Sequence, residues 1–337
     1  MSSYDALVAF LSNSVNSLDK DSLRSVRSVG PYARDLSDNL QQTMVTSTIN
    51  PIDLNHHRYT NMRELIVRNT NELKFMVFLP NLTRMTLRDT KVDDISALAA
   101  CTHLEHLDLC GTWVNDISAL AACTHLRHLD LGFDRVVDIS ALAACTKLEH
   151  LYMYETSVVD ISALAACTNL RYLDLDHVVS VVDISALAAC TNLVHLYMYS
   201  TSVVDISALA KCTKLEHLYL ACTCVQDISA LVKCTKLEHL DLSSSGVIDI
   251  SALAACTNLE HLQLNETKVV DISALVACTN LRYLELNHVF NVINISVLAA
   301  CPLLEHLELR ETNIRVKAIS ALVARTKKKL NVVILYT

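Results

Sequence analysis

The chain repeats the tripeptide Asp-Ile-Ser at a nearly constant interval, and this interval constrains its fold more than any other feature. The tripeptide recurs from Asp94 to Asp271 and returns as Asn-Ile-Ser at Asn294. Successive copies lie 22 residues apart, except for steps of 23 residues before Asp183 and before Asn294. A fixed period in this range is typical of a solenoid, in which each repeat packs only against its neighbours.

Each repeat also contains the pattern Leu-x-x-Leu-x-Leu, as at Leu104, Leu107 and Leu109. Its alternation predicts a short strand that buries these leucines and turns His106 and Asp108 outward. The Ser-Ala-Leu-Ala-Ala run that follows predicts a short helical turn, capped by the aspartate or the serine of Asp-Ile-Ser. We therefore predict an α/β solenoid with a curved parallel β-sheet on the concave face and short helices or turns on the convex face.

Over roughly residues 82–324 this spacing resembles the 22-residue leucine-rich repeats of phosphatase-regulator proteins and bacterial internalins. The resemblance implies a long concave wall that binds other proteins. Those families stack asparagines at a position where this chain has other residues, so we expect a less rigid ladder of hydrogen bonds here. The residues at that position are Thr112, Asp134, Thr156, Thr201, Thr223, Ser245, Thr267 and Thr312.

We predict two regions: a helical N-terminal segment over residues 1–60, and a solenoid with atypical terminal coils over residues 61–337. The run from Leu18 to Leu36 resembles a divergent F-box. That resemblance implies a substrate adaptor of a cullin-based ubiquitin ligase, in which this segment docks a linker protein and the concave wall selects the client. The alternative is a helical cap over the first coil, and the sequence leaves both interpretations open.

Ten of the 13 cysteines recur once per repeat, from Cys101 to Cys301, and each precedes Thr or Pro. We predict that they point inward as small apolar side chains, and that Cys110, Cys222 and Cys224 are exposed. Many free thiols indicate a reducing compartment. We find no signal peptide and no run of about 18 apolar residues. We therefore expect a cytoplasmic protein without a membrane segment, with nuclear, cytoskeletal or flagellar locations as alternatives.

The solenoid itself is duplicated over five repeats. The segment from Asn169 to Ser180 returns nearly unchanged from Asn280 to Asn291, at an offset of 111 residues. Across this offset the buried positions persist, whereas the outward positions of the first copy are richer in aromatic residues. Such side chains, with arginine, often anchor protein interfaces. The predicted contact face comprises Trp113, Phe133, Arg135, Tyr152, Tyr154, Asp174, Asp176, Tyr197, Tyr199 and Tyr219.

A column of histidines occupies one outward strand position, interrupted by Tyr172 and Tyr283. Neighbouring imidazoles near Asp108 and Asp130 suggest zinc binding or a response to pH, but repeat duplication alone also produces such a column. We assign no cofactor and no catalytic residue, because the histidines and aspartates recur in coil after coil, whereas an active site is a single constellation. The net charge of −8 argues against nucleic acid as a partner. We predict a non-enzymatic scaffold for a protein partner; the alternatives are the ligase adaptor and a structural subunit of a cytoskeletal or flagellar assembly.

Overall fold

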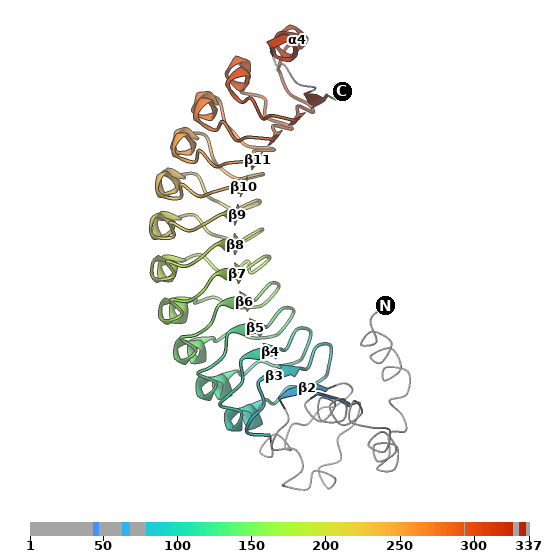
Figure 1. The fold of residues 1–337 in the computed structure, drawn as a ribbon, viewed down its shortest axis with the longest axis vertical. Coiled ribbons are helices and arrows are strands. Elements are labelled where there is room, and N and C mark those ends of the chain that lie inside the picture. Colours follow the sequence, from blue (N-terminus) through green and yellow to red (C-terminus); the bar gives the residue numbers. More distant parts are fainter. Residues whose placement is uncertain (1–42, 47–62, 68–78, 293, 326–329, 335–337) are drawn as a thin grey trace, which may run out of the picture.

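The computed structural model describes residues 43–46, 63–67, 79–292, 294–325 and 330–334. Within these residues the chain forms one sheet of 14 strands, paired in sequence order, and every pairing is parallel. Figure 1 shows this sheet on the inner side of a curved ribbon. The strands are β1 (Thr43–Thr46), β2 (Glu64–Val67), β3 (Arg84–Thr86), β4 (His106–Asp108), β5 (His128–Asp130), β6 (His150–Tyr152), β7 (Tyr172–Asp174), β8 (His195–Tyr197), β9 (His217–Tyr219), β10 (His239–Asp241), β11 (His261–Gln263), β12 (Tyr283–Glu285), β13 (His306–Glu308) and β14 (Asn331–Val333).

Short 3₁₀ turns line the outer side of the curve (Figure 1). The turns are η3 (Ser96–Ala100), η4 (Ser118–Ala122), η5 (Ser140–Ala144), η6 (Ser162–Ala166), η7 (Ser185–Ala189), η8 (Ser207–Lys211), η9 (Ser229–Lys233), η10 (Ser251–Ala255), η11 (Ser273–Ala277) and η12 (Ser296–Ala300). One longer helix, α4 (Val316–Arg325), replaces the turn before β14. The predicted solenoid with a concave parallel sheet is confirmed.

The aspartate of Asp-Ile-Ser starts each turn. In η4, Asp116 Oδ1 accepts a hydrogen bond from the Ser118 N–H at 2.8 Å, and the Leu120 N–H donates to the Ile117 carbonyl at 2.9 Å. The same aspartate-to-serine contact recurs in the other coils, with Asn294 in the same role before η12. Five residues suffice for one 3₁₀ turn, which keeps the outer side of each coil thin.

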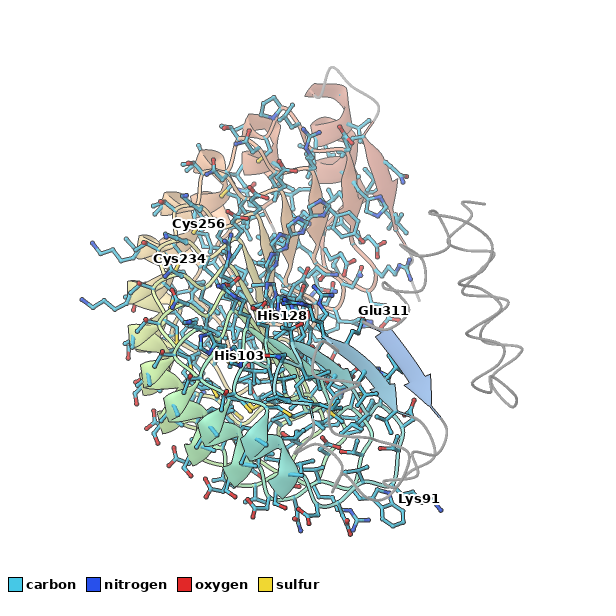
Figure 2. The ribbon with its side chains drawn as sticks, turned by 60° about the horizontal axis from the view of Figure 1, so that its bottom comes forward. Lys91, His103, His128, Cys234, Cys256 and Glu311 are labelled. Atoms are coloured by element: carbon cyan, nitrogen blue, oxygen red, sulfur yellow. The ribbon has the colours of Figure 1, made fainter. Side chains whose placement is uncertain are left out.

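The repeated cysteines lie in the core, as predicted, and their thiols bond the backbone of the preceding coil. Cys145 Sγ donates to the Leu120 carbonyl at 3.4 Å, and the same contact recurs along the row. Burial raises the pKa of Cys145 to about 12, so the thiol keeps the proton that it donates. Figure 2 shows Cys234 and Cys256 near the turns, away from His128 on the sheet.

The prediction that Cys110 is exposed is wrong, because the Cys110 side chain is buried. The Tyr154 hydroxyl lies 3.2 Å from Cys110 Sγ, and the Tyr154 ring crosses above Gly132, where an added Cβ would lie only 2.3 Å from the ring. A glycine in the intervening coil therefore lets an aromatic side chain from two coils away cover the thiol. Cys222 and Cys224 are exposed, as predicted.

The position that other families fill with asparagine is buried here and mostly bonds its own coil. The hydroxyl of Thr156 donates to the carbonyl three residues earlier at 2.7 Å, and four further threonines repeat this contact. Thr112 differs, since its hydroxyl donates to Asp134 Oδ1 in the next coil at 3.0 Å. Asp134 is 3% exposed and its other carboxylate oxygen has no hydrogen-bond partner among the described residues. Burial raises the pKa of Asp134 to about 7.

Both ends of the sheet extend beyond the regular coils. Strands β2 and β14 lie at the two ends of the region for which the sequence predicted atypical terminal coils. Strand β1, within residues 1–60, pairs with β2 and was not anticipated. The helices proposed for residues 1–60, and with them the F-box-like run, lie outside the described residues, so the division of that segment from the solenoid remains a prediction. In the part of the chain that is described, no helix has the length and apolar character needed to cross a bilayer.

Candidate functional site on the concave face

Each regular strand presents two outward rows of side chains, because its middle residue is buried and its first and third residues are partly exposed. The first-position row holds the histidines, with Tyr172 and Tyr283 at its two interruptions. The third-position row varies in chemistry from coil to coil. In order from β4 to β13, this third row consists of Asp108, Asp130, Tyr152, Asp174, Tyr197, Tyr219, Asp241, Gln263, Glu285 and Glu308.

The histidines of the first row stack on one another. The ring centroids of His128 and His150 lie 4.2 Å apart with an interplanar angle of 7°, and those of His239 and His261 lie 4.3 Å apart. Burial lowers the pKa of His128 to about 4, and the neighbouring imidazoles add to this effect. Burial also lowers the pKa of His217 and of His239. These rings are therefore neutral near pH 7 and stack without mutual repulsion.

The tyrosines of the third row form a continuous aromatic surface, to which Tyr172 of the first row also belongs. The rings of Tyr197 and Tyr219 stack at 4.7 Å with an interplanar angle of 7°. Tyr172 lies 4.7 Å from Tyr152 and 5.2 Å from Tyr197, but 6.0 Å from His150 in its own row. We call these four tyrosines the tyrosine strip.

Sequence reasoning missed Tyr172 because it treated this residue only as a gap in the histidine column. The third-position residue of the same strand is Asp174, whose short side chain leaves room between Tyr152 and Tyr197. The Tyr172 ring fills that room. The signal was available in the sequence. Strand β7 carries a tyrosine at its first position and a small aspartate at its third, whereas the strands on either side carry a tyrosine at the third position.

Three carboxylates border the tyrosine strip: Asp174, Asp176 and Asp241. Each accepts a backbone N–H, from Asp176, Tyr199 and Ser243 respectively. None of the three forms an ion pair with another residue that the structure describes. Burial raises the pKa of Asp174 to about 6 and also raises the pKa of Asp176 and of Asp241. Partly buried carboxylates without a cation are costly, and a positively charged group would stabilise them.

Two carboxylates of the second copy, Glu285 and Glu308, are satisfied within the protein. Glu285, which matches Asp174, accepts hydrogen bonds from the Asn265 amide and the Tyr283 hydroxyl. Glu308, which matches Tyr197, contacts His306 at 3.0 Å, the Asn287 amide at 3.0 Å and Arg310 at 3.4 Å. The hydrogen bond from His306 lowers the pKa of Glu308.

The remaining predicted contact residues lie beyond the ends of the strands. Tyr154 and Tyr199 follow their strands by two residues, and the exposed side chains of Trp113, Phe133 and Arg135 lie on the next turn of the chain. The Phe133 and Tyr154 rings meet edge to face at 5.1 Å, and the Arg135 guanidinium lies 5.9 Å from the Trp113 ring. The structure therefore places these residues in the segments that follow the strands, outside the two rows of the sheet.

The comparison with protein families identifies the repeat. A model of paired leucine-rich repeats matches residues 102–144, 191–233, 213–255 and 235–277. These matches fall on the coils whose leucines line the core. The chain is a leucine-rich-repeat protein.

Solved leucine-rich-repeat structures share the fold. An internalin (InlF) of Listeria monocytogenes is 25% identical, with a TM-score of 0.74, and the match covers 93% of this chain and 88% of the internalin chain. The functional domain of InlJ from the same organism, described as including a cysteine ladder, is 16% identical with a TM-score of 0.72, covering 87% of this chain and 62% of that one. No curated protein matches the chain's sequence at a significant level.

A plant receptor-kinase ectodomain extends this comparison to a bound complex. The ectodomain of GASSHO1/SCHENGEN3 from Arabidopsis thaliana, solved with CASPARIAN STRIP INTEGRITY FACTOR 2, is 16% identical with a TM-score of 0.61, and the match covers 87% of this chain and 41% of the receptor chain. The leucine-rich-repeat fold is thus a common scaffold for protein interaction, and its members are in general not enzymes.

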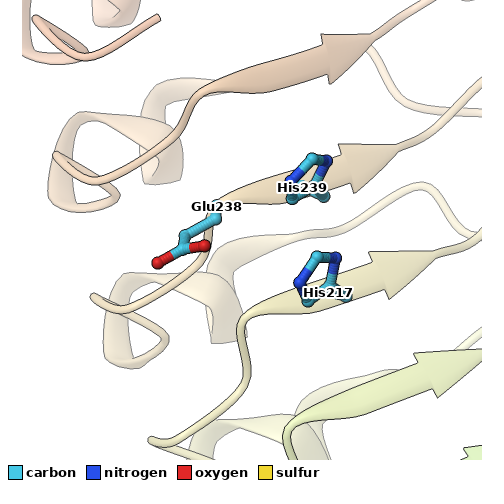
Figure 3. A group of neighbouring side chains, drawn as sticks. All are labelled: His217, Glu238 and His239. Carbon is cyan, nitrogen blue, oxygen red and sulfur yellow. The ribbon is translucent and has the colours of Figure 1, made fainter.

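One group of side chains on the leucine-rich-repeat sheet has the composition of a metal site. Single ligand atoms of His217, Glu238 and His239 lie within 4.8 Å of one another. Figure 3 shows the two rings projecting in the same direction from neighbouring strands, with Glu238 beside the start of its strand. The planes of the two rings differ by only 12°, whereas zinc requires ligands arranged tetrahedrally around it. We therefore assign no metal to this group.

Proposed function

We propose that this protein is a non-enzymatic interaction scaffold that binds a protein partner on the concave face, over strands β5 to β10. The observation that carries the proposal is the tyrosine strip, together with three carboxylates that form no ion pair among the described residues. Tyrosines on a rigid surface are frequent anchors of protein interfaces. The plant receptor ectodomain, which was solved in complex with CASPARIAN STRIP INTEGRITY FACTOR 2, supports this use of the fold.

Affinity purification of the full chain tests the proposal. The double variant Tyr152→Ala with Tyr197→Ala should lose its specific partner, and its affinity for that partner should fall by on the order of 2 kcal/mol or more in calorimetry. The matched control is Gln263→Ala with Glu308→Ala, at the same register in the second copy, which should retain the partner. Equal losses in both double variants would place the contact elsewhere.

The compartment that we propose is a reducing one. The thiols of the cysteine row donate hydrogen bonds to backbone carbonyls, and Cys222 and Cys224 are exposed. Exposed thiols persist in the cytosol and nucleus and are readily oxidised outside the cell. Thiol labelling of the protein in intact cells should modify both exposed cysteines; protection by oxidation would contradict this assignment.

A further inference from the structure

The partner's chemistry follows from the order of side chains along the third row. From β7 to β10 this order is Asp174, Tyr197, Tyr219 and Asp241, as the register of the parallel strands shows. A stacked pair of tyrosines is thus enclosed between two carboxylates. The two tyrosine rings offer aromatic faces, and each carboxylate accepts only one backbone N–H.

This arrangement selects a guanidinium group over other side chains. Arginine donates two parallel hydrogen bonds to a carboxylate and stacks on an aromatic face at the same time. Lysine provides the charge but neither the planar fork nor the stacking. Acidic side chains would meet Asp174, Asp176 and Asp241 with like charge. The burial that raises the pKa of Asp174 to about 6 also makes an added cation favourable there.

The spacing fixes how two arginines would be placed. Asp174 and Asp241 lie three strands apart, which is about 14 Å at the usual strand separation of about 4.8 Å. An extended peptide rises about 3.4 Å per residue, so residues four apart span the same distance and project from the same side. The residue midway between them also faces the sheet and lies over Tyr197 and Tyr219.

We propose that the partner presents an extended Arg-x-Φ-x-Arg segment, in which the two arginines bind Asp174 and Asp241 and the apolar residue Φ packs on the stacked tyrosines. This inference rests on the proposed function of the concave face. The positions of the second copy that match Asp174 and Tyr197 lack the same capacity. Glu285 is already bonded to Tyr283, and Glu308 to His306, Asn287 and Arg310.

A labelled peptide tests the inference without knowledge of the natural partner. The probe is fluorescein-Gly-Ser-Arg-Ser-Leu-Ser-Arg-Ser-Gly, and fluorescence anisotropy measures its dissociation constant for the full chain. Replacement of both peptide arginines by glutamine should weaken binding at least tenfold, replacement by lysine should weaken it severalfold, and moving one arginine by one position should weaken it as well. Equal affinity of the arginine and glutamine peptides, or no binding of the arginine peptide at 1 mM, would overturn the inference.

Protein variants then locate the site. Asp174→Asn with Asp241→Asn should weaken binding of the probe peptide at least tenfold. Asparagine can still accept the backbone hydrogen bonds and removes only the negative charge. The matched control Glu285→Gln should change the affinity less than twofold. If the asparagine variant binds the probe unchanged while Tyr152→Ala with Tyr197→Ala still loses the natural partner, the arginine inference fails and the scaffold function stands. If neither pair of variants affects the natural partner, the scaffold function fails as well.

Discussion

Strands β7 and β8 and their copies β12 and β13 bury the same residues but present different chemistry to solvent. Leu173 and Leu284 are both fully buried, and they occupy equivalent register positions. On the concave face, however, the Asp174 carboxylate accepts one backbone N–H and Tyr197 stacks on neighbouring tyrosines, whereas their counterparts Glu285 and Glu308 are held by hydrogen bonds from neighbouring side chains. The duplication therefore distinguishes the residues that pack in the core of each coil from the exposed residues, which the fold does not constrain.

The buried leucines that the two copies share predict the largest effect, which is on the free energy of unfolding. Leu173→Ala and Leu284→Ala should each lower the free energy of unfolding by about 3 kcal/mol, because each leaves a cavity in an equally close-packed coil. Urea denaturation followed by circular dichroism measures both values. Matched sites should lose equal free energies of unfolding. If the losses of the two variants differ by more than about 1 kcal/mol, the cores of the two copies are not equivalent.

The second prediction concerns the buried ladder, where Asp134 matches Ser245. The pKa of Asp134 is raised to about 7, above its ordinary value of 3.8, so the folded protein binds this proton more tightly than the unfolded chain does. The free energy of unfolding should therefore fall as the pH rises from about 4 to 7. Asp134→Asn should remove this dependence and stabilise the protein by about 2 kcal/mol at pH 8.

Ser245→Asn is the control for this change. The Ser245 hydroxyl is also buried without a hydrogen-bond partner among the described residues, but it does not titrate. Thermal unfolding between pH 4 and 8 should show that Asp134→Asn raises the melting temperature by an amount that depends on pH. The change in melting temperature for Ser245→Asn should not depend on pH. If the melting temperatures of both variants depend on pH in the same way, titration of the Asp134 carboxylate does not cause the pH dependence of stability.

The fold was predictable from sequence because its determinants are local and repeated. The leucines fix the strand register, the aspartate before each Ile-Ser pair caps a 3₁₀ turn, and each coil repeats the same solution. The site was predictable only in part, because its contacts link different coils. The sequence indicated the tyrosines, but the inclusion of Tyr172 and the burial of Cys110 under Tyr154 depend on the size of intervening side chains. The internal pairing of Glu308 likewise required coordinates.

The exposed residues that differ between the two copies predict a gain in affinity for the arginine peptide. Glu308→Tyr with Arg310→Tyr places the first-copy residues at the matching positions of the second copy. This variant should remove the contacts of Glu308 with His306 and Arg310, and it places an aromatic face beside Glu285, which keeps its hydrogen bonds from Asn265 and Tyr283. In a background that carries Asp174→Asn and Asp241→Asn, the arginine peptide should then bind more tightly by on the order of 1 kcal/mol. No gain would mean that the tyrosines and a nearby carboxylate are insufficient to hold arginine.

The smallest expected effect concerns the histidine row, where His128 matches His239. Both pKa values are lowered first by burial and then by neighbouring imidazoles, but Glu238 and Glu260 partly offset the effect at His239, while Glu149 does so at His128. A histidine whose pKa is lowered on folding makes the protein less stable as the pH falls below about 6.5, since the unfolded chain then binds more protons.

At pH 5, His128→Gln should relieve this loss by less than about 1 kcal/mol, because the ring is partly exposed and solvent screens its charge. His239→Gln should relieve less, because two glutamates already favour the charged form of that ring. At pH 7.5, where both imidazoles are neutral, the two variants should have the same melting temperature as each other. A larger gain for His239→Gln at pH 5 would show that contacts with neighbouring imidazoles, rather than the number of nearby glutamates, decide how each ring of the row responds to acid.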